Sequence, residues 1–440
     1  MRRPTWSTAA LPPLLRRALV WLLALTALGF VAHVVPLRDR CEDPGLGEPA
    51  GPPANAPPGG IAGARPPRLA VTRDDSGGCT LLRPAGGQRL APQACAALVC
   101  EPGLVTALSS ARVAWLVPLL ALYFAGTLAW AARWRALLAL GGVRAPLLAV
   151  WRVTLESQAG GILLPGGVGG DALRVGFGTA LGRRGAPPRE SAPGVPAAST
   201  ATVIATVLLD RALGLVTVSL AAATAAWLFA RDGEDAGLRA ATVVLAALPI
   251  AFVGMLVTLR HVHARVGPRA RHARARGSAA PADRAPSPLR ALAARVVTPV
   301  LEYVGDPGAP RAIARAAAIS VLVSASQLAV VRGILLALGA SPSAEGLVYV
   351  GTTMAFIVAI VPGLPGGWGT SDAAFVFFLA RAGIAPSSAL AVSLIYRLFW
   401  YGSGGVGALL FLLRGAGGGG GRGADPLERR VSDVPRPGPS

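Results

Sequence analysis

Charged residues inside apolar stretches are the part of this sequence best placed to do chemistry. Asp210 and Arg211 interrupt the apolar stretch 201–230, and Arg397 interrupts the stretch 389–413. A charge at the centre of a bilayer costs about 2.5 to 3.5 kcal/mol on insertion scales, so each side chain should face protein and find a partner. These residues are therefore candidates for binding a charged group or relaying a proton, and a purely structural buried pair is the alternative.

Two matching glycine-rich breaks lie in the middle of two further apolar stretches, 147–181 and 347–379. Residues 164–172 read LPGGVGGDA, and residues 364–373 read LPGGWGTSDA. The residues that recur are Pro165, Gly166, Gly167 and Gly169 in the first copy and Pro365, Gly366, Gly367 and Gly369 in the second. Proline removes a backbone donor and glycine allows a tight reversal, so no helix should pass through either cluster intact. Chance matching in a glycine-rich protein is the alternative.

An aspartate follows each break, Asp171 in the first copy and Asp372 in the second, and Arg174 lies one turn after Asp171. Each aspartate would cap the half-helix that restarts there, or would handle a ligand or a proton. Half-helices that begin near the middle of a bilayer direct free N–H groups and positive dipole ends to that level. Such an arrangement would hold an anionic group such as a lipid phosphate.

The elements that must position these residues are membrane helices. The chain has 440 residues, a mean hydropathy of +0.54 and only 15% charged residues, whereas a soluble domain carries roughly a quarter. About 20 apolar residues cross a bilayer. Six stretches qualify: 18–35, 113–132, 201–230, 240–259, 316–338 and 389–413. We predict an all-α polytopic membrane protein with six spanning helices and two broken, re-entrant helix pairs in an inverted repeat. A full span plus a stub is the alternative for each broken stretch.

The basic residues set the orientation of these helices. All 42 basic residues are arginine, so a Walker A lysine and a Schiff-base lysine are both excluded. The arginines gather before the first span, between the fourth and fifth spans and after the last, which predicts that both termini are cytoplasmic in a cell (inner) membrane. The arginine run after residue 260 suits anionic lipid headgroups better than nucleic acid. The predicted division is 1–36, cytoplasmic N-terminus and first span; 37–112, extracytoplasmic loop; 113–413, transmembrane domain with a basic cytoplasmic loop 260–315; and 414–440, disordered cytoplasmic tail.

All four cysteines lie in the loop 37–112: Cys41, Cys79, Cys95 and Cys100. An even number confined to the one long outer segment suits disulfides in an oxidising compartment, and three connectivities are open. A metal site is disfavoured because the loop lacks histidine and has no CxxC pair.

Four motifs, which lie between about residues 115 and 413, together resemble those of a known family. They are PGGVGGDALR at 165–174, LDR at 209–211, PGGWG at 365–369 followed by Asp372, and YR at 396–397. Together they resemble the lysylphosphatidylglycerol synthase transmembrane (flippase-like) family, without the soluble aminoacyl-transferase domain of its larger members. The resemblance implies that Asp171, Arg174, Asp210, Arg211 and Arg397 occupy family motif positions. Asp372 stands where the family more often has glutamate, which leaves the ligand geometry open.

The resemblance implies a protein that binds a phospholipid or polyprenyl-linked lipid and moves it between leaflets, with no cofactor, no metal, no nucleic acid and no catalytic residue. One alternative is a membrane transferase acting on a lipid-linked substrate, although the sequence has neither a DxD nor an HxxxD motif. A non-catalytic scaffold that works with an enzyme of an envelope lipid pathway is the other.

Overall fold

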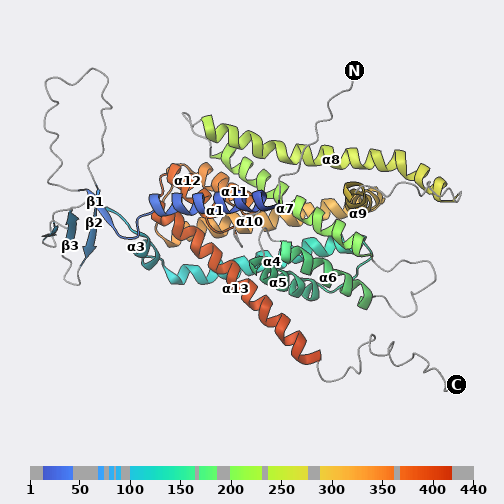
Figure 1. Cartoon of the computed structure of the whole chain (residues 1–440), viewed down its shortest axis with the longest axis horizontal. Coiled ribbons are helices and arrows are strands. Elements are labelled where there is room, and N and C mark those ends of the chain that lie inside the picture. The colour runs from blue at the N-terminus through green and yellow to red at the C-terminus, as the bar shows by residue number, and fades with distance from the viewer. Residues whose placement is uncertain are drawn as a thin grey trace, which may run out of the picture.

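The computed structural model describes residues 13–42, 68–73, 79–83, 86–90, 100–163, 168–185, 199–229, 236–275, 288–360 and 367–418. These residues form twelve helices and five strands (Figure 1). The helices make one long bundle, and the strands lie at one end of it. The chain is therefore mostly helical, as the apolar stretches predict.

Each of the six predicted spans lies in a helix. These helices are α1 (Pro13–Val34), α4 (Val113–Leu140), α7 (Thr200–Leu228), α8 (Ala236–Ala275), α10 (Ala309–Ala337) and α13 (Pro386–Gly418). Among the described residues, α4, α7, α8 and α10 contain stretches long and apolar enough to cross a membrane. Four candidate spans support a multi-pass protein, and the full count of six stays a prediction. Several of these helices exceed their predicted bounds; for example, α8 extends into the basic loop, and α13 runs to Gly418.

The two broken stretches each form a pair of helices, with the glycine cluster between them. The first pair is α5 (Leu147–Leu163) and α6 (Val168–Gly185), and the second is α11 (Glu345–Ile360) and α12 (Thr370–Arg381). Pro165, Gly166, Gly167, Pro365 and Gly366 lie outside the described residues. Gly367 and Gly369 adopt positive φ angles of 69° and 79°, which L-residues with side chains rarely adopt, so they make the turn into α12.

The helices approach closely where glycine allows it. A Cβ atom on Gly170 of α6 would lie 2.5 Å from the carbonyl oxygen of Ser157 on α5. On Gly407 of α13 it would lie 2.0 Å from the carbonyl oxygen of Leu155 on α5. The helix α5 is therefore held backbone to backbone by α6 and α13. The other main pairings join α4 to α10, α11 to α12, and α11 to α7.

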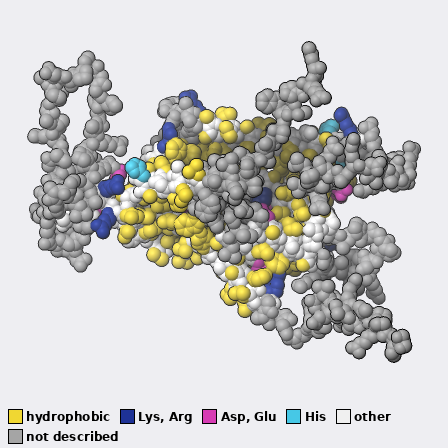
Figure 2. Space-filling view, in the orientation of Figure 1, with side chains coloured by type: hydrophobic (Ala, Val, Ile, Leu, Met, Phe, Trp, Pro, Cys, Tyr) yellow, Lys and Arg dark blue, Asp and Glu magenta, His cyan; other side chains and the backbone are white. Residues whose placement is uncertain are grey.

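The main apolar core lies among the later helices. It joins α10, α11, α12 and α13 with parts of α1, α7 and α8. Its fully buried members include Val331, Ile334, Val348, Leu379 and Val392. Large apolar side chains are also exposed on the outside of the bundle, among them Trp227 and Ile250, which are 74% and 75% exposed. Figure 2 shows these apolar side chains spread over the face of the bundle. An apolar surface of this extent suits contact with lipid.

The segment 37–112 contains a small β-sheet that the prediction of an all-α protein missed. Its strands are β1 (Arg40–Glu42), β2 (Arg68–Arg73), β3 (Cys79–Arg83), β4 (Gly86–Leu90) and β5 (Cys100–Glu101), in the order β4-β3-β2-β1-β5, with all pairs antiparallel. Strands of two to six residues amid proline and glycine carry too little alternation to be recognised in the sequence. The short helix α3 (Leu104–Ser109) connects this sheet to α4, and α9 (Pro288–Gly305) precedes α10.

A disulfide between Cys41 and Cys100 closes the base of the sheet, where β1 pairs with β5. Cys79 is also disulfide-bonded, and Cys95 lies outside the described residues. The backbone N–H of Gly103 donates to the Asp39 carboxylate at 2.7 Å. These contacts hold the sheet against the ends of α1 and α3. No group of metal-ligating side chains occurs in the described part of the chain.

Candidate functional site

Asp210 on α7 is the centre of a fully buried ion cluster. Its Oδ1 atom accepts a hydrogen bond from Nε of Arg133 on α4 at 2.7 Å. Its Oδ2 atom accepts from Nη1 of Arg174 on α6 at 2.7 Å and from the indole N–H of Trp130 on α4 at 2.8 Å. The side chains of Asp210, Arg133 and Arg174 are each at most 4% exposed. Asp210 therefore joins α4, α6 and α7 through three donors.

Arg174 occupies an aromatic slot beside this carboxylate. Its guanidinium carbon lies 4.9 Å from the ring centre of Trp130 and 4.4 Å from that of Trp134. Its Nε and Nη2 atoms are buried and have no hydrogen-bond partner among the described residues. The ring faces take the place of such partners, because a cation is attracted to the π-face of tryptophan. The cluster holds two guanidinium groups against one carboxylate, so it carries an excess positive charge.

Two ion pairs follow the breaks; the Asp171 pair is partly exposed, whereas the Asp372–Arg397 pair is at most 6% exposed. Asp171 lies in the first turn of α6, and its Oδ1 atom accepts from both Nε and Nη2 of Arg211 on α7, at 3.0 and 2.8 Å. The Asp171 and Arg211 side chains are 34% and 41% exposed. This pair is therefore accessible to a ligand in a way that the Asp210 cluster is not.

Asp372 forms the second pair, at the start of α12. Its Oδ2 atom accepts from the backbone N–H of Gly369 at 2.9 Å, so the side chain caps the helix. Its Oδ1 atom accepts from Ser393 Oγ at 2.6 Å and from Arg397 Nη2 at 2.7 Å, both on α13. The same Nη2 atom also donates to Ser371 Oγ at 3.0 Å. This carboxylate thus caps the helix, which is one of the two roles that the sequence left open, and also pairs with Arg397.

The two pairs have the same construction. In each, an aspartate in the first turn after a break pairs with an arginine of the next long helix, α7 or α13. In each, a tryptophan ring lies against that arginine: Trp130 is 5.7 Å from Arg211, and Trp368 is 4.5 Å from Arg397. The resemblance between the breaks therefore extends from the sequence to the contacts around them.

A cavity of about 460 Å³ borders both pairs, and we refer to it as the central cavity. Asp171 and Arg211 of the first pair line it, and so do Arg397 of the second pair and its neighbours Ser371 and Ser393. Each lining arginine is paired with an aspartate, Arg211 with Asp171 and Arg397 with Asp372, so the two pairs together are electrically balanced. The remaining lining residues are polar, small or aromatic, apart from Leu215.

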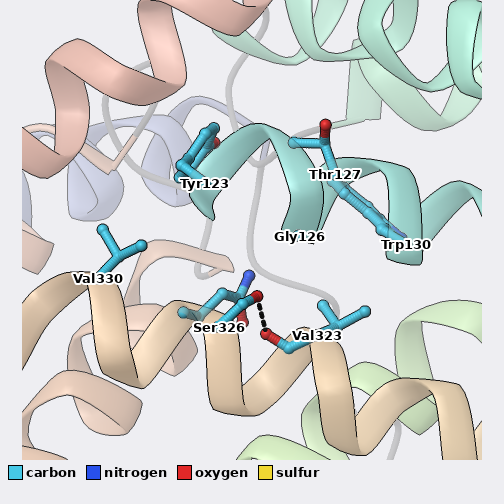
Figure 3. A pocket seen from close by; sticks show the side chains of 8 residues that line it. Tyr123, Gly126, Thr127, Trp130, Val323, Ser326 and Val330 are labelled. Carbon is cyan, nitrogen blue, oxygen red and sulfur yellow. Dashed lines mark hydrogen bonds between the residues drawn. The ribbon is translucent and has the colours of Figure 1, made fainter. Parts of the chain in front are cut away.

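Two smaller cavities adjoin the central one. One of about 190 Å³ is lined by Arg133, Arg211 and apolar residues of α7, α10 and α11. The other, of about 30 Å³, lies between α4 and α10, where Tyr123, Gly126 and Thr127 face Val323 and Ser326 (Figure 3). In that view the Ser326 hydroxyl donates to the Val323 carbonyl oxygen, at 2.8 Å. Trp130 and Gln327 line all three cavities.

The structure places the six predicted site residues in two settings. Asp171, Arg211 and Arg397 line the central cavity, and Asp372 lies directly behind Arg397. Arg174 and Asp210 belong to the buried cluster and are not among the residues that line the central cavity, although Trp130 of the cluster is.

Sequence reasoning missed Arg133, Trp130, Trp368 and Ser393. Arg133 follows the second predicted span, 77 residues before Asp210, so no local signal in the sequence indicates the pairing.

The family model for the lysylphosphatidylglycerol synthase TM region matches residues 103–405. The chain therefore belongs to this family, and it is an integral, multi-pass membrane protein related to lipid handling. No curated protein and no solved structure matches the chain.

Proposed function

We propose that the central cavity binds the headgroup of a phospholipid or polyprenyl-linked lipid and that the protein moves it between the two leaflets. The observation that carries this proposal is that the arginines of both the Asp171–Arg211 and the Asp372–Arg397 pairs line one cavity. A guanidinium group can bind phosphate through two N–H donors, and Arg211 already directs two N–H groups at the Asp171 carboxylate. A lipid phosphate would therefore replace an aspartate as the partner of each arginine in turn.

The packing of the helices supports an inverted repeat made of α4–α7 and α10–α13. The helix α4 packs on α10, which occupies the same place in the second half. The helix α5 packs on α13, and its counterpart α11 packs on α7. Such an exchange of partners is expected when two halves are related by a two-fold axis, and transporters built this way bind substrate where the halves meet.

Orientation and division of the chain belong to the same proposal. Both termini would be cytoplasmic in the cell inner membrane, which places the disulfide-bonded sheet outside. The segment 1–36 would hold the first span, 37–112 the outer insert, 113–413 the translocating domain and 414–440 the tail. Movement would be downhill or coupled to protons or to the membrane potential, because the sequence contains no Walker A lysine.

Native mass spectrometry of the gently purified protein tests the proposal. We expect a copurified lipid with a phosphate headgroup on the wild type, and its loss from an Arg211→Gln/Arg397→Gln double variant. Arg315→Gln is the control, because it makes one such arginine-to-glutamine change at an exposed position on α10. Equal lipid occupancy in all three proteins would contradict a headgroup site in the cavity. Product formation from a lipid-linked substrate would instead favour a membrane transferase, and a tightly copurified pathway enzyme without lipid would favour a scaffold.

A further inference from the structure

Gln158 on α5 is a buried amide on the wall of the central cavity. It is 4% exposed, and its Oε1 atom accepts a hydrogen bond from the Ser403 hydroxyl on α13. Its Nε2 atom is buried and has no hydrogen-bond partner among the described residues. Leaving a buried donor unpaired costs about 1–3 kcal/mol, so native structures rarely retain one without a reason. Ser403 occupies the oxygen end of this amide, and Gln158 is among the residues that line the central cavity, which makes a ligand in the cavity a candidate partner for the donor.

A second glutamine lines the same cavity from the opposite helix. Gln327 on α10 is partly buried and borders the central cavity and both smaller ones. An amide both donates and accepts without carrying charge. Two such groups suit a headgroup with several hydroxyls, because a hydroxyl also donates and accepts.

Aromatic rings supply most of the rest of the wall. The six that line the central cavity are Tyr123, Trp130, Phe356, Phe375, Tyr396 and Trp400. Flat apolar surface with a few placed polar groups is the usual lining of a site for a ring-shaped organic ligand. The C–H faces of a sugar or cyclitol ring would pack on these rings while its hydroxyls reach the amides.

The charges of the wall disfavour a cationic headgroup. Asp171 is the one carboxylate among the residues that line the central cavity, and Arg211 holds it with two N–H donors. Asp372, the other carboxylate of the two pairs, lies behind Arg397 and is held by it. An ammonium group would therefore find no carboxylate on the wall that is not already paired with an arginine.

We infer that the lipid bound here carries a phosphate ester of an uncharged polyhydroxyl group, such as a sugar or cyclitol, and that Gln158 and Gln327 select it. This inference rests on the proposed headgroup site and adds its specificity. Glycosylated polyprenyl phosphates and cyclitol phospholipids share this chemistry.

Binding to the full-length protein in nanodiscs tests the inference, with four probes. These are phosphatidylinositol, a glucosyl polyprenyl phosphate, phosphatidic acid and lysyl-phosphatidylglycerol. One hydrogen bond made to the headgroup contributes about 1 kcal/mol, so a polyhydroxyl probe should bind about fivefold more tightly than phosphatidic acid. Lysyl-phosphatidylglycerol should bind most weakly. The ratio of the affinities for phosphatidylinositol and for the glucosyl polyprenyl phosphate shows whether the site prefers a cyclitol phospholipid or a glycosylated polyprenyl phosphate.

Variants of the two glutamines make the test specific. Gln158→Leu and Gln327→Leu should each lower the preference for the polyhydroxyl probes, and the variant that combines them should reduce it to near unity, while phosphatidic acid still binds. Gln158→Glu should shift preference toward lysyl-phosphatidylglycerol, because it adds a carboxylate to the wall. Equal binding of all probes by the wild type, or an unchanged preference in both leucine variants, would overturn the inference. Loss of all lipid binding, by contrast, would overturn the proposed function itself.

Discussion

Replacement of Asp210 by asparagine should destabilise the fold more than it alters the cavity. Asp210 is fully buried and accepts from Arg133, Arg174 and Trp130 at 2.7 to 2.8 Å. Asparagine keeps one acceptor oxygen but turns the other atom into an N–H₂ donor. That donor would face either the Arg133 side or the Arg174 side of the cluster, where donors already point.

The size of the stability loss follows from the two guanidinium charges that remain after Asp210 is replaced. Removing one partner of a buried ion pair costs about 3–5 kcal/mol, because the remaining charge is neither solvated nor paired. In Asp210→Asn, two buried guanidinium groups lose their shared carboxylate. In the double variant Asp210→Asn/Arg174→Met, one guanidinium is removed as well, so the excess charge returns to its original value. We expect the double variant to recover about half of the lost stability.

Equilibrium unfolding in mixed micelles, followed by tryptophan fluorescence, measures this loss. Trp130 and Trp134 flank Arg174 at 4.9 and 4.4 Å, so their emission reports on the cluster itself. Asp171→Asn is the control, because the Asp171 side chain is 34% exposed and water can solvate the Arg211 guanidinium that loses its partner. We expect it to cost less than about 1 kcal/mol.

The reasoning would be refuted by an Asp210→Asn protein as stable as the wild type. If that stable variant also lost headgroup translocation, Asp210 would be a proton or ligand group rather than a structural one. A double variant less stable than Asp210→Asn would likewise show that the excess charge is not what destabilises the cluster.

Three further predictions concern packing, the outer insert and a remote ion pair. Gly407→Leu should lower the melting temperature by several degrees in a thermal-shift assay, because even a Cβ atom there meets the Leu155 carbonyl oxygen at 2.0 Å. Gly405→Leu is its control, because a Cβ atom on Gly405 has no other atom within 4 Å. Cys41→Ser should cost the sheet about 2–4 kcal/mol and expose the insert to proteolysis while the helices remain protected, since the bond closes a separation of 59 residues. Arg332→Gln should destabilise the protein by about 1–3 kcal/mol, measured by unfolding, and leave headgroup binding unchanged, because Arg332 pairs with a glutamate outside the central cavity.

Each of these has an outcome that would count against it. Similar melting temperatures for the two glycine variants would mean that α5 and α13 are not in backbone contact. A proteolysis pattern unaffected by the serine change would mean that the disulfide does not hold the insert. Loss of lipid binding in Arg332→Gln would extend the site beyond the cavity described above.

The broken helices were predictable because their signal is local. Proline and glycine at the two breaks interrupt helices whatever surrounds them, and the structure ends one helix and begins another around each cluster. The six apolar stretches were predictable for the same reason, since length and hydropathy are properties of the segment itself.

The partners of the charged residues were not predictable, because they depend on contacts far apart in the chain. Asp210 and Arg211 are neighbours in sequence, yet they serve different clusters. Successive residues of a helix point about 100° apart, so Asp210 faces α4 and α6 inside the bundle while Arg211 faces the cavity. Nothing local to α4 indicates that Arg133 lies against Asp210 rather than reaching the membrane surface.

Headgroup translocation in proteoliposomes tests the central claim most directly. A fluorescent phospholipid in the inner leaflet is protected from a membrane-impermeant quencher unless it crosses. The wild type and Arg315→Gln should make the protected half accessible, whereas Arg211→Gln/Arg397→Gln should resemble protein-free vesicles. A double variant that matches the wild type in rate, while folded to the same extent, would contradict the claim that the two aspartate–arginine pairs carry the headgroup across.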